Sequence, residues 1–260
     1  MASTLPTIVL VHGAWQVPAS YQPFIDTLIA LGFTVHCPRL PSCNGAQPPT
    51  ASLPDDVSCV REVIVGLVES GERVLLVMHS YGGIVGTDAS TGLSIRERQA
   101  TGATGGIIHL VYLCAYLLQP GTSVLDIINE SGSASLLPQF VHAADDGTTF
   151  PVDPVRSLLG GMDQRDIDAA LPHLVRFPAS AMATPAAGDA WRRIPITYVH
   201  TTDDYAVFKS FQDIMLRKVR ENGVEVKTAE YESNHSVFLT KREEMGRVVV
   251  AAAQDTRNSA

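Results

Sequence analysis

The sequence predicts an α/β domain: a mostly parallel sheet with helices on both faces and an inserted helical cap. Two observations lead to this fold class. Apolar, β-branched runs alternate with segments whose apolar residues recur at helical spacing, and the alternation lapses once, between residues 118 and 191. The chain of 260 residues can bury a substantial core, and its 45% hydrophobic and 18% charged residues are typical of a globular protein.

Strands are expected where β-branched or apolar residues run without interruption. In chain order these runs are residues 7–12 (TIVLVH), 33–37 (FTVHC), 73–78 (RVLLVM), 106–114 (GIIHLVYLC), 195–200 (PITYVH) and 224–231 (VEVKTAEY). Helices between successive strands imply right-handed crossovers, and therefore parallel strands that are covered on both faces.

Helices are expected where apolar residues return every three or four positions. These segments are residues 20–32, residues 55–70, a helix that begins just after Ser80, residues 208–219 and residues 242–253. A Pro-rich loop over residues 38–54 precedes the second of them.

Residues 118–191 interrupt this alternation. The segment is rich in Ala, Pro, Asp and Ser, and it has helix-like pieces at residues 123–129 and 164–174. A structureless loop of this length is improbable inside a compact domain. We therefore expect residues 1–117 and 192–260 to form the core, and residues 118–191 to form a helical cap over it.

Composition excludes several classes of partner. The net charge of −8 is spread along the chain, whereas nucleic acids and anionic membranes recruit basic patches. The sequence lacks a secretory signal and an apolar run of membrane-spanning length, so a cytoplasmic protein with a small-molecule substrate is expected. The cysteines Cys37, Cys43, Cys59 and Cys114 lack metal-site spacing and should be reduced, with a Cys37–Cys43 bridge as the alternative. A homodimer and a monomer are the alternatives for the oligomeric state.

Ser80 follows a predicted strand and precedes two glycines, in the sequence Met78-His79-Ser80-Tyr81-Gly82-Gly83. A sharp turn from strand to helix would expose its hydroxyl at the carboxyl edge of the sheet, where ligands bind. The nucleophile-elbow pattern is Gly-x-Ser-x-Gly, so Met78 stands where glycine is expected. The alternative is a serine that merely occupies a glycine-rich turn.

An acid and a base follow Ser80 in the order that a serine nucleophile on such a sheet needs. Asp203 and Asp204 come after the strand at residues 195–200, and His235 comes after the strand at residues 224–231. The carboxyl ends of parallel strands share one edge, so these side chains should meet. This order favours a catalytic triad over a structural histidine.

Two backbone N–H groups should face the negative charge that develops during attack. One belongs to the residue after the nucleophile, Tyr81, and the other to the loop after the first strand, where Ala14 is the expected donor. His12 is expected to brace that loop, and His79 to be structural because neighbouring strand residues point to opposite faces. Neither metal-ligand spacing nor a phosphate-binding glycine loop is present, so no metal or organic cofactor is expected.

The motifs LVHGAW, HSYGG, DDYAVFKSFQ and NHSVFLT occur in the order and spacing of one known group. The chain resembles the α/β-hydrolase superfamily, and within it the branch of plant methyl esterases and hydroxynitrile lyases with fungal and bacterial relatives. In this branch the acid precedes a segment that ends in Phe-Gln, which implies that Asp204 is the acid rather than Asp203. The departure is Met78, whose size should bear on the geometry of the turn.

The resemblance alone does not distinguish hydrolysis from cleavage by a lyase, because the branch contains both esterases and lyases. Related hydroxynitrile lyases have Thr and Lys where this chain has Gly13 and Ser236, which points to hydrolysis of a small, largely apolar ester or lactone through an acyl-enzyme. A lyase, a C–C bond-cleaving enzyme or a ligand receptor on the same fold are the alternatives. The apolar residues that either line an acyl pocket or join cap to core are Leu117, Leu118, Leu136, Leu137, Phe140, Met162 and Trp191.

Overall fold

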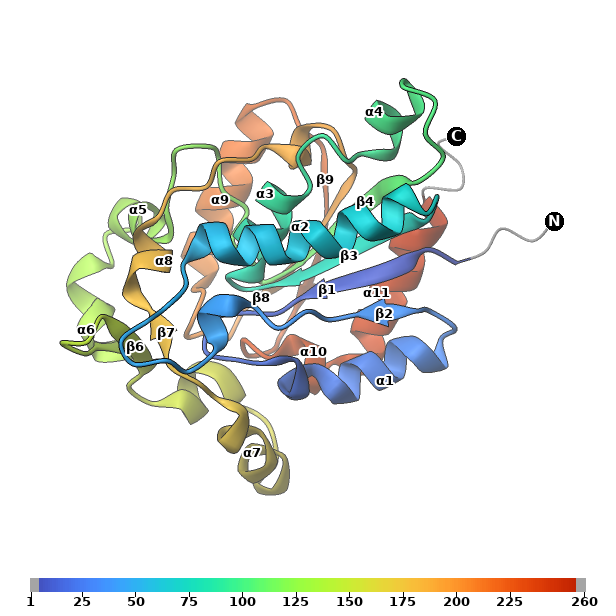
Figure 1. The fold of residues 1–260 in the computed structure, drawn as a ribbon. Helices are drawn as coiled ribbons and strands as arrows, with labels where there is room; N and C mark the ends of the chain where they lie inside the picture. The colour runs from blue at the N-terminus through green and yellow to red at the C-terminus, as the bar shows by residue number, and fades with distance from the viewer. Residues whose placement is uncertain (1–4, 256–260) are drawn as a thin grey trace.

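The computed structural model describes residues 5–255 and has a six-stranded sheet at its centre (Figure 1). The strand order is β2-β1-β3-β4-β8-β9, and every neighbouring pair is parallel. The strands are β1 (Thr7–Val11), β2 (Val35–His36), β3 (Arg73–His79), β4 (Gly106–Leu113), β8 (Ile196–Thr201) and β9 (Val226–Tyr231). The predicted α/β class with its parallel sheet is confirmed.

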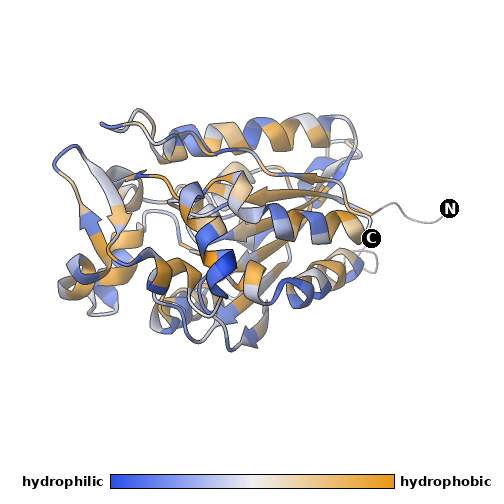
Figure 2. Ribbon diagram, turned by 90° about the horizontal axis from the view of Figure 1, so that it is seen from below, coloured by the Kyte–Doolittle hydropathy of each residue, from blue (hydrophilic) through white to orange (hydrophobic). Residues whose placement is uncertain are grey.

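Helices cover both faces of this sheet (Figure 1). One face is covered by α2 (Leu53–Glu69), α3 (Gly82–Ala89) and α9 (Lys209–Glu221). The other is covered by α1 (Gln22–Ala30), α10 (Val237–Thr240) and α11 (Arg242–Asp255), while the short α4 (Ile95–Gln99) precedes β4. These helices carry hydrophobic and hydrophilic residues along their length, as surface helices with one buried side do (Figure 2).

Helix α2 shows how the sequence determines one of these elements. Val60, Ile64 and Val68 recur every four residues and are buried against the sheet. The helix begins before the predicted Asp55, because the Asp55 side chain accepts a hydrogen bond from the Ser52 N–H at 2.8 Å and so stabilises the first turn.

The strand order reverses at β1, which has β2 on one side and β3 on the other. The loop after β1 and the turn after β3 therefore emerge next to each other at the carboxyl edge of the sheet. Open parallel sheets bind their ligands at such a switch point. The fold thus brings the segments of Ala14 and Ser80 together.

Residues 118–191 lie beyond this carboxyl edge (Figure 1). They contain the expected helices α5 (Val124–Glu130) and α7 (Gln164–Ala170), together with α6 (Leu137–Phe140) and α8 (Ala179–Ala183). The expectation of a purely helical segment is incomplete, because β5 (Val141–Ala143), β6 (Thr148–Pro151) and β7 (Phe177–Pro178) form an antiparallel sheet, here called the small sheet. Strands of two to four residues are too short to show alternation in a sequence.

None of the helices within residues 5–255 combines the length and apolar character needed to cross a membrane. Cys37, Cys43, Cys59 and Cys114 are free thiols.

Candidate active site

Ser80 occupies a strained turn between β3 and α3. Its φ is 55°, in the left-handed region that residues other than glycine rarely adopt. The end of β4 holds this conformation, since the Ser80 N–H donates to the Leu113 carbonyl at 3.3 Å and the Ser80 carbonyl accepts from the Tyr116 N–H at 3.0 Å. The turn has the sharp strand-to-helix form of a nucleophile elbow.

The two glycines after Tyr81 are required by close backbone contacts. A Cβ atom at Gly82 would lie 2.3 Å from the carbonyl oxygen of Val11, and one at Gly83 would lie 2.4 Å from that of Tyr116. Neither glycine has a positive φ. The absence of a side chain, rather than backbone freedom, is what the turn needs from both residues.

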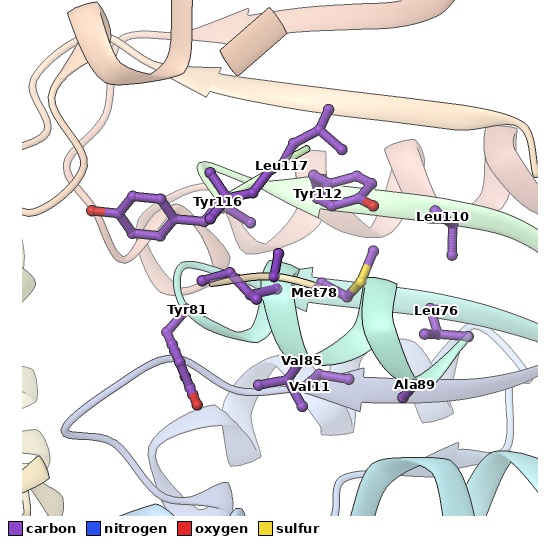
Figure 3. Close-up of a cluster of buried hydrophobic side chains, with 14 of the residues drawn as sticks. Val11, Leu76, Met78, Tyr81, Val85, Ala89, Leu110, Tyr112, Tyr116 and Leu117 are labelled. Atoms are coloured by element: carbon purple, nitrogen blue, oxygen red, sulfur yellow. The ribbon is translucent and has the colours of Figure 1, made fainter. Parts of the chain in front are cut away.

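Met78, the departure from the elbow pattern, is fully buried beneath this turn. It pairs with Val11 of β1 and Tyr112 of β4 in the sheet. Figure 3 shows it in the cluster that also contains Leu76 and Val85. The large side chain is therefore accommodated inside the core, and the left-handed turn at Ser80 is retained.

Asp204 and His235 form a buried pair at the ends of β8 and β9. The Nδ1 atom of His235 lies 2.9 Å from Oδ2 of Asp204. The same carboxylate accepts hydrogen bonds from the Thr201 hydroxyl at 2.8 Å and from the Ala206 and Val207 N–H groups at 2.9 and 2.8 Å. A carboxylate beside Nδ1 places the imidazole proton there, which leaves Nε2 as a proton acceptor.

The amide of Gln212 holds the loop that carries this carboxylate. Its Nε2 donates to the carbonyls of Thr201 and Val207 at 3.1 and 2.8 Å, and its Oε1 accepts from the Thr201 N–H at 3.2 Å. The loop that carries Asp204 is therefore fixed at both ends. Asp203 is exposed, so the structure brings Asp204 and not Asp203 to His235.

His79 lies beside His235 rather than pointing away from it. The two rings are 4.5 Å apart, and Nε2 of His79 is 2.9 Å from the His235 carbonyl oxygen. Because a carbonyl only accepts, Nε2 carries the proton, and Nδ1 lies 2.6 Å from the Tyr21 hydroxyl, which donates to Oε1 of Gln16. Burial holds the pKa of His79 well below its usual value, so the ring is neutral. Its contacts are structural, as expected, although the strand end turns it toward the site.

His79, Cys114 and His235 each bring a possible metal-ligand atom within 4.8 Å of the others. A cation there would have to displace the hydrogen bonds of His79 and the bond between His235 and Asp204. Burial also raises the pKa of the Cys114 thiol, whereas metal ligation requires the thiolate. This cluster does not fit a metal ion.

The loop after β1 lies against the Ser80 turn. A Cβ atom at Gly13 would be 2.9 Å from Cβ of Ser80, so only glycine permits this approach. The Gly13 N–H donates to the Tyr21 hydroxyl at 2.9 Å. Within residues 5–255, the N–H groups of Ala14 and Tyr81 donate to no other protein group. They are available to a ligand, which is what an oxyanion hole requires.

His12 braces the same loop. Its Nε2 accepts a hydrogen bond from the Leu40 N–H at 3.0 Å, and its Nδ1 lies 3.0 Å from the Gly13 carbonyl oxygen. Burial lowers the pKa of His12 to about 4, which keeps the ring neutral. The histidine thus joins the first loop to the Pro-rich loop.

An apolar cavity lies between the core and residues 118–191, next to the segments that carry Ala14 and Asp204. Its empty space is about 550 Å³ including the opening to solvent. The lining residues include Trp15, Tyr116, Leu137, Phe140 and Phe208, and none of the lining residues is charged. Of the apolar residues that the sequence offered for a pocket, Leu137 and Phe140 line it.

The remaining candidates lie elsewhere. Leu117, Leu118 and Trp191 are buried in the core, Leu136 is exposed, and Met162 lines a separate cleft.

The sequence alone did not predict the hydrogen bonds that Tyr21, Gln212 and Trp15 make. Tyr21 bonds to His79 across 58 positions of the chain, and Trp15 bonds to Thr149 across 134. Only Gln212 had a sequence signal, as the last residue of the Phe-Gln segment.

A family model and a similar protein both indicate the same family. Residues 8–252 match the model of the alpha/beta hydrolase family. The chain is 30% identical to the alpha/beta hydrolase nvfD of Aspergillus novofumigatus, over 95% of this chain and 96% of that protein. It is 29% identical to a carbendazim hydrolyzing esterase of Nocardioides sp., over 54% of this chain and 55% of that protein.

Among solved structures, tomato methylketone synthase I complexed with 2-tridecanone superposes with a TM-score of 0.76 at 18% identity. The match covers 98% of this chain and 100% of the tomato chain. At this identity the likeness concerns the fold alone. The match to the family model confirms the superfamily that the sequence motifs indicated.

Proposed function

This chain belongs to the alpha/beta hydrolase family, and from that premise we propose that it is a serine hydrolase which cleaves a small, largely apolar carboxylic ester or lactone. The observation that carries the proposal is the buried 2.9 Å contact between His235 and Asp204, at the sheet edge where Ser80 occupies its left-handed turn. The names of the Aspergillus and Nocardioides relatives, a hydrolase and an esterase, support the same reaction class.

Each step of this reaction has a residue suited to it. The Ser80 hydroxyl attacks the ester carbonyl carbon while its proton passes to Nε2 of His235, and Asp204 stabilises the imidazolium that forms. The N–H groups of Ala14 and Tyr81 bind the resulting oxyanion. When the tetrahedral intermediate collapses, His235 returns the proton to the leaving oxygen, and Ser80 remains acylated. A water activated by His235 then releases the acid and restores the serine.

The cavity supports the substrate class. An uncharged, apolar lining favours an aliphatic or aromatic group and disfavours a charged one, whose desolvation would be uncompensated. The cavity is lined by Trp15, Tyr116 and Tyr205, which are neighbours in sequence or space of Ala14, Ser80 and Asp204. The cavity thus adjoins the candidate site, although Ser80, Asp204 and His235 do not themselves line it.

The test combines covalent labelling with turnover. A fluorophosphonate probe should label the protein at Ser80, as located by mass spectrometry, and Ser80→Ala should abolish labelling together with turnover of p-nitrophenyl esters, methyl esters and lactones. Ser58→Ala, on the exposed side of α2, is the matched control and should leave both unchanged. Labelling that persists in Ser80→Ala, or C–C bond cleavage without turnover of any ester or lactone, would refute the proposal.

A further inference from the structure

We propose that the small sheet of residues 118–191 positions the oxyanion hole, and that Phe177 is the positioning residue through which it acts. The inference rests on the proposed function, because it concerns the two N–H groups assigned there to the oxyanion. It gives this segment a role in catalysis, in addition to lining the apolar cavity. Tyr81 carries one of these N–H groups, and Trp15 follows the residue that carries the other. Both side chains contact residues 118–191.

The first of these contacts is made by Trp15, which directly follows Ala14. Its φ is 61°, an unfavourable conformation for a bulky side chain, which persists only where the surroundings enforce it. The indole Nε1 donates to the carbonyl and the hydroxyl oxygen of Thr149 at 3.2 and 3.1 Å. The Trp15 carbonyl accepts from the Val175 N–H at 2.8 Å. Both partners belong to residues 118–191.

The second contact is made by the side chain of Tyr81. Its hydroxyl donates to Oδ2 of the buried Asp56 at 2.8 Å, and Oδ1 of Asp56 accepts from the Ser42 N–H at 2.8 Å. Its ring meets the Phe177 ring edge to face, with centroids 4.8 Å apart at 71°. Tyr81 is therefore held by the core at its hydroxyl and by the small sheet at its ring.

Phe177 joins these two contacts. It is fully buried, and its ring also meets the Trp15 ring at 5.9 Å and 65°. Thr149 pairs with Phe177 in the register of β6 and β7, and its hydroxyl donates to the Phe177 carbonyl at 2.9 Å. One ring thus packs against Trp15 and Tyr81 alike, while Thr149 binds both Trp15 and Phe177.

This arrangement should matter for rate because the oxyanion site depends on precise placement. Interiors are close-packed, so a smaller side chain at Phe177 lets both neighbouring rings shift. A misplacement of about 1 Å can cost on the order of 10²-fold in rate, and losing one oxyanion donor costs about 10²- to 10³-fold. A residue that only fills space would change stability and leave the transition state alone.

The experiment compares Phe177→Leu and Thr149→Val with Leu159→Val. Leu159 is equally buried within residues 118–191, and it makes neither the ring contacts nor the hydrogen bonds described above. For each protein, kcat and KM are measured on the best ester of the panel, with active sites counted by endpoint fluorophosphonate labelling. The inhibition constants of an alkyl boronic acid, which forms a tetrahedral adduct with the serine, and of the product carboxylic acid are measured in parallel.

We expect Phe177→Leu and Thr149→Val to lower kcat by about 10- to 100-fold with little change in KM. Boronic acid affinity should fall in parallel, whereas product affinity and the parameters of Leu159→Val should stay near those of the parent. Unchanged kcat and boronic acid affinity in both variants would overturn the inference, as would an equal loss in Leu159→Val. Failure of the parent to react at Ser80 would instead refute the proposed function, and the inference with it.

Discussion

The sulfur of Met78 occupies the space that Gly86 leaves open in α3. A Cβ atom at Gly86 would lie 2.4 Å from Sδ and 2.8 Å from Cγ of Met78, so the two positions are sterically coupled. Met78 stands where the elbow pattern has glycine, and the helix that follows the elbow has a glycine where Met78 packs. The bulk of one residue is thus matched by the absence of a side chain at the other.

We therefore expect the effects of Gly86→Ala and Met78→Ala on stability to be non-additive. Overpacking should make Gly86→Ala destabilising by ~1–3 kcal/mol, less the ~1 kcal/mol by which alanine favours a helix. Met78→Ala should cost ~2–5 kcal/mol, because it leaves a cavity. In the double variant the new methyl group enters that cavity, so its loss should be smaller than the sum. Urea unfolding of the four proteins measures this coupling, and strictly additive losses would contradict the packing argument.

The contact between Asp204 and His235 predicts an unequal effect of two neighbouring substitutions. Asp204→Asn should lower kcat by roughly 10³- to 10⁴-fold, because an amide favours the wrong imidazole tautomer. Asp203→Asn is the matched control, since Asp203 is exposed, and its kcat should stay within a few-fold of the parent. Steady-state kinetics on one ester decides between them. The reverse ranking would show that the acid had been assigned one residue too late.

Buried His12 predicts a loss of stability in acid. Burial lowers its pKa from 6.5 to about 4, so between these pH values His12 is protonated in the unfolded chain but not in the folded protein. Its contribution to the free energy of unfolding is therefore fully present above pH 6.5. It decreases by roughly 3 kcal/mol as the pH drops toward 4. His109, whose pKa burial also lowers to about 4, acts in the same window.

His12→Gln isolates this contribution, because its amide oxygen can still accept from the Leu40 N–H. The unfolding free energy of the variant, measured in urea between pH 4.5 and 7.5, should vary less with pH than that of the parent. Parallel curves for the two proteins would exclude His12 as the cause.

The fold and the order of the candidate triad were predictable because both depend on local sequence patterns. Strand runs, helical spacing and the residues at strand ends are visible without knowing any distant contact. The small sheet was not predictable, since Thr149 and Phe177 lie in strands of four and two residues. The roles of Tyr21 and Trp15 were hidden as well, because their partners lie 58 and 134 positions away. A sequence shows which residues recur, but not which distant pairs the packing joins.

The apolar cavity predicts which substitution changes substrate preference. Phe140 lines the cavity and packs edge to face on Phe208, with centroids 5.1 Å apart. Phe140→Ala removes this wall, so longer acyl chains should gain binding energy at about 0.8 kcal/mol for each methylene group that becomes buried. In a series of p-nitrophenyl esters from acetate to decanoate, the optimum of kcat/KM should move to a longer chain.

Leu118→Ala is the control for this prediction, because Leu118 is buried without lining the cavity. It should lower stability and leave the chain-length profile in place. Leu118 was also one of the residues that the sequence offered equally as pocket wall or as joint between cap and core. A shifted optimum in Leu118→Ala together with an unshifted one in Phe140→Ala would show that the acyl group does not occupy this cavity.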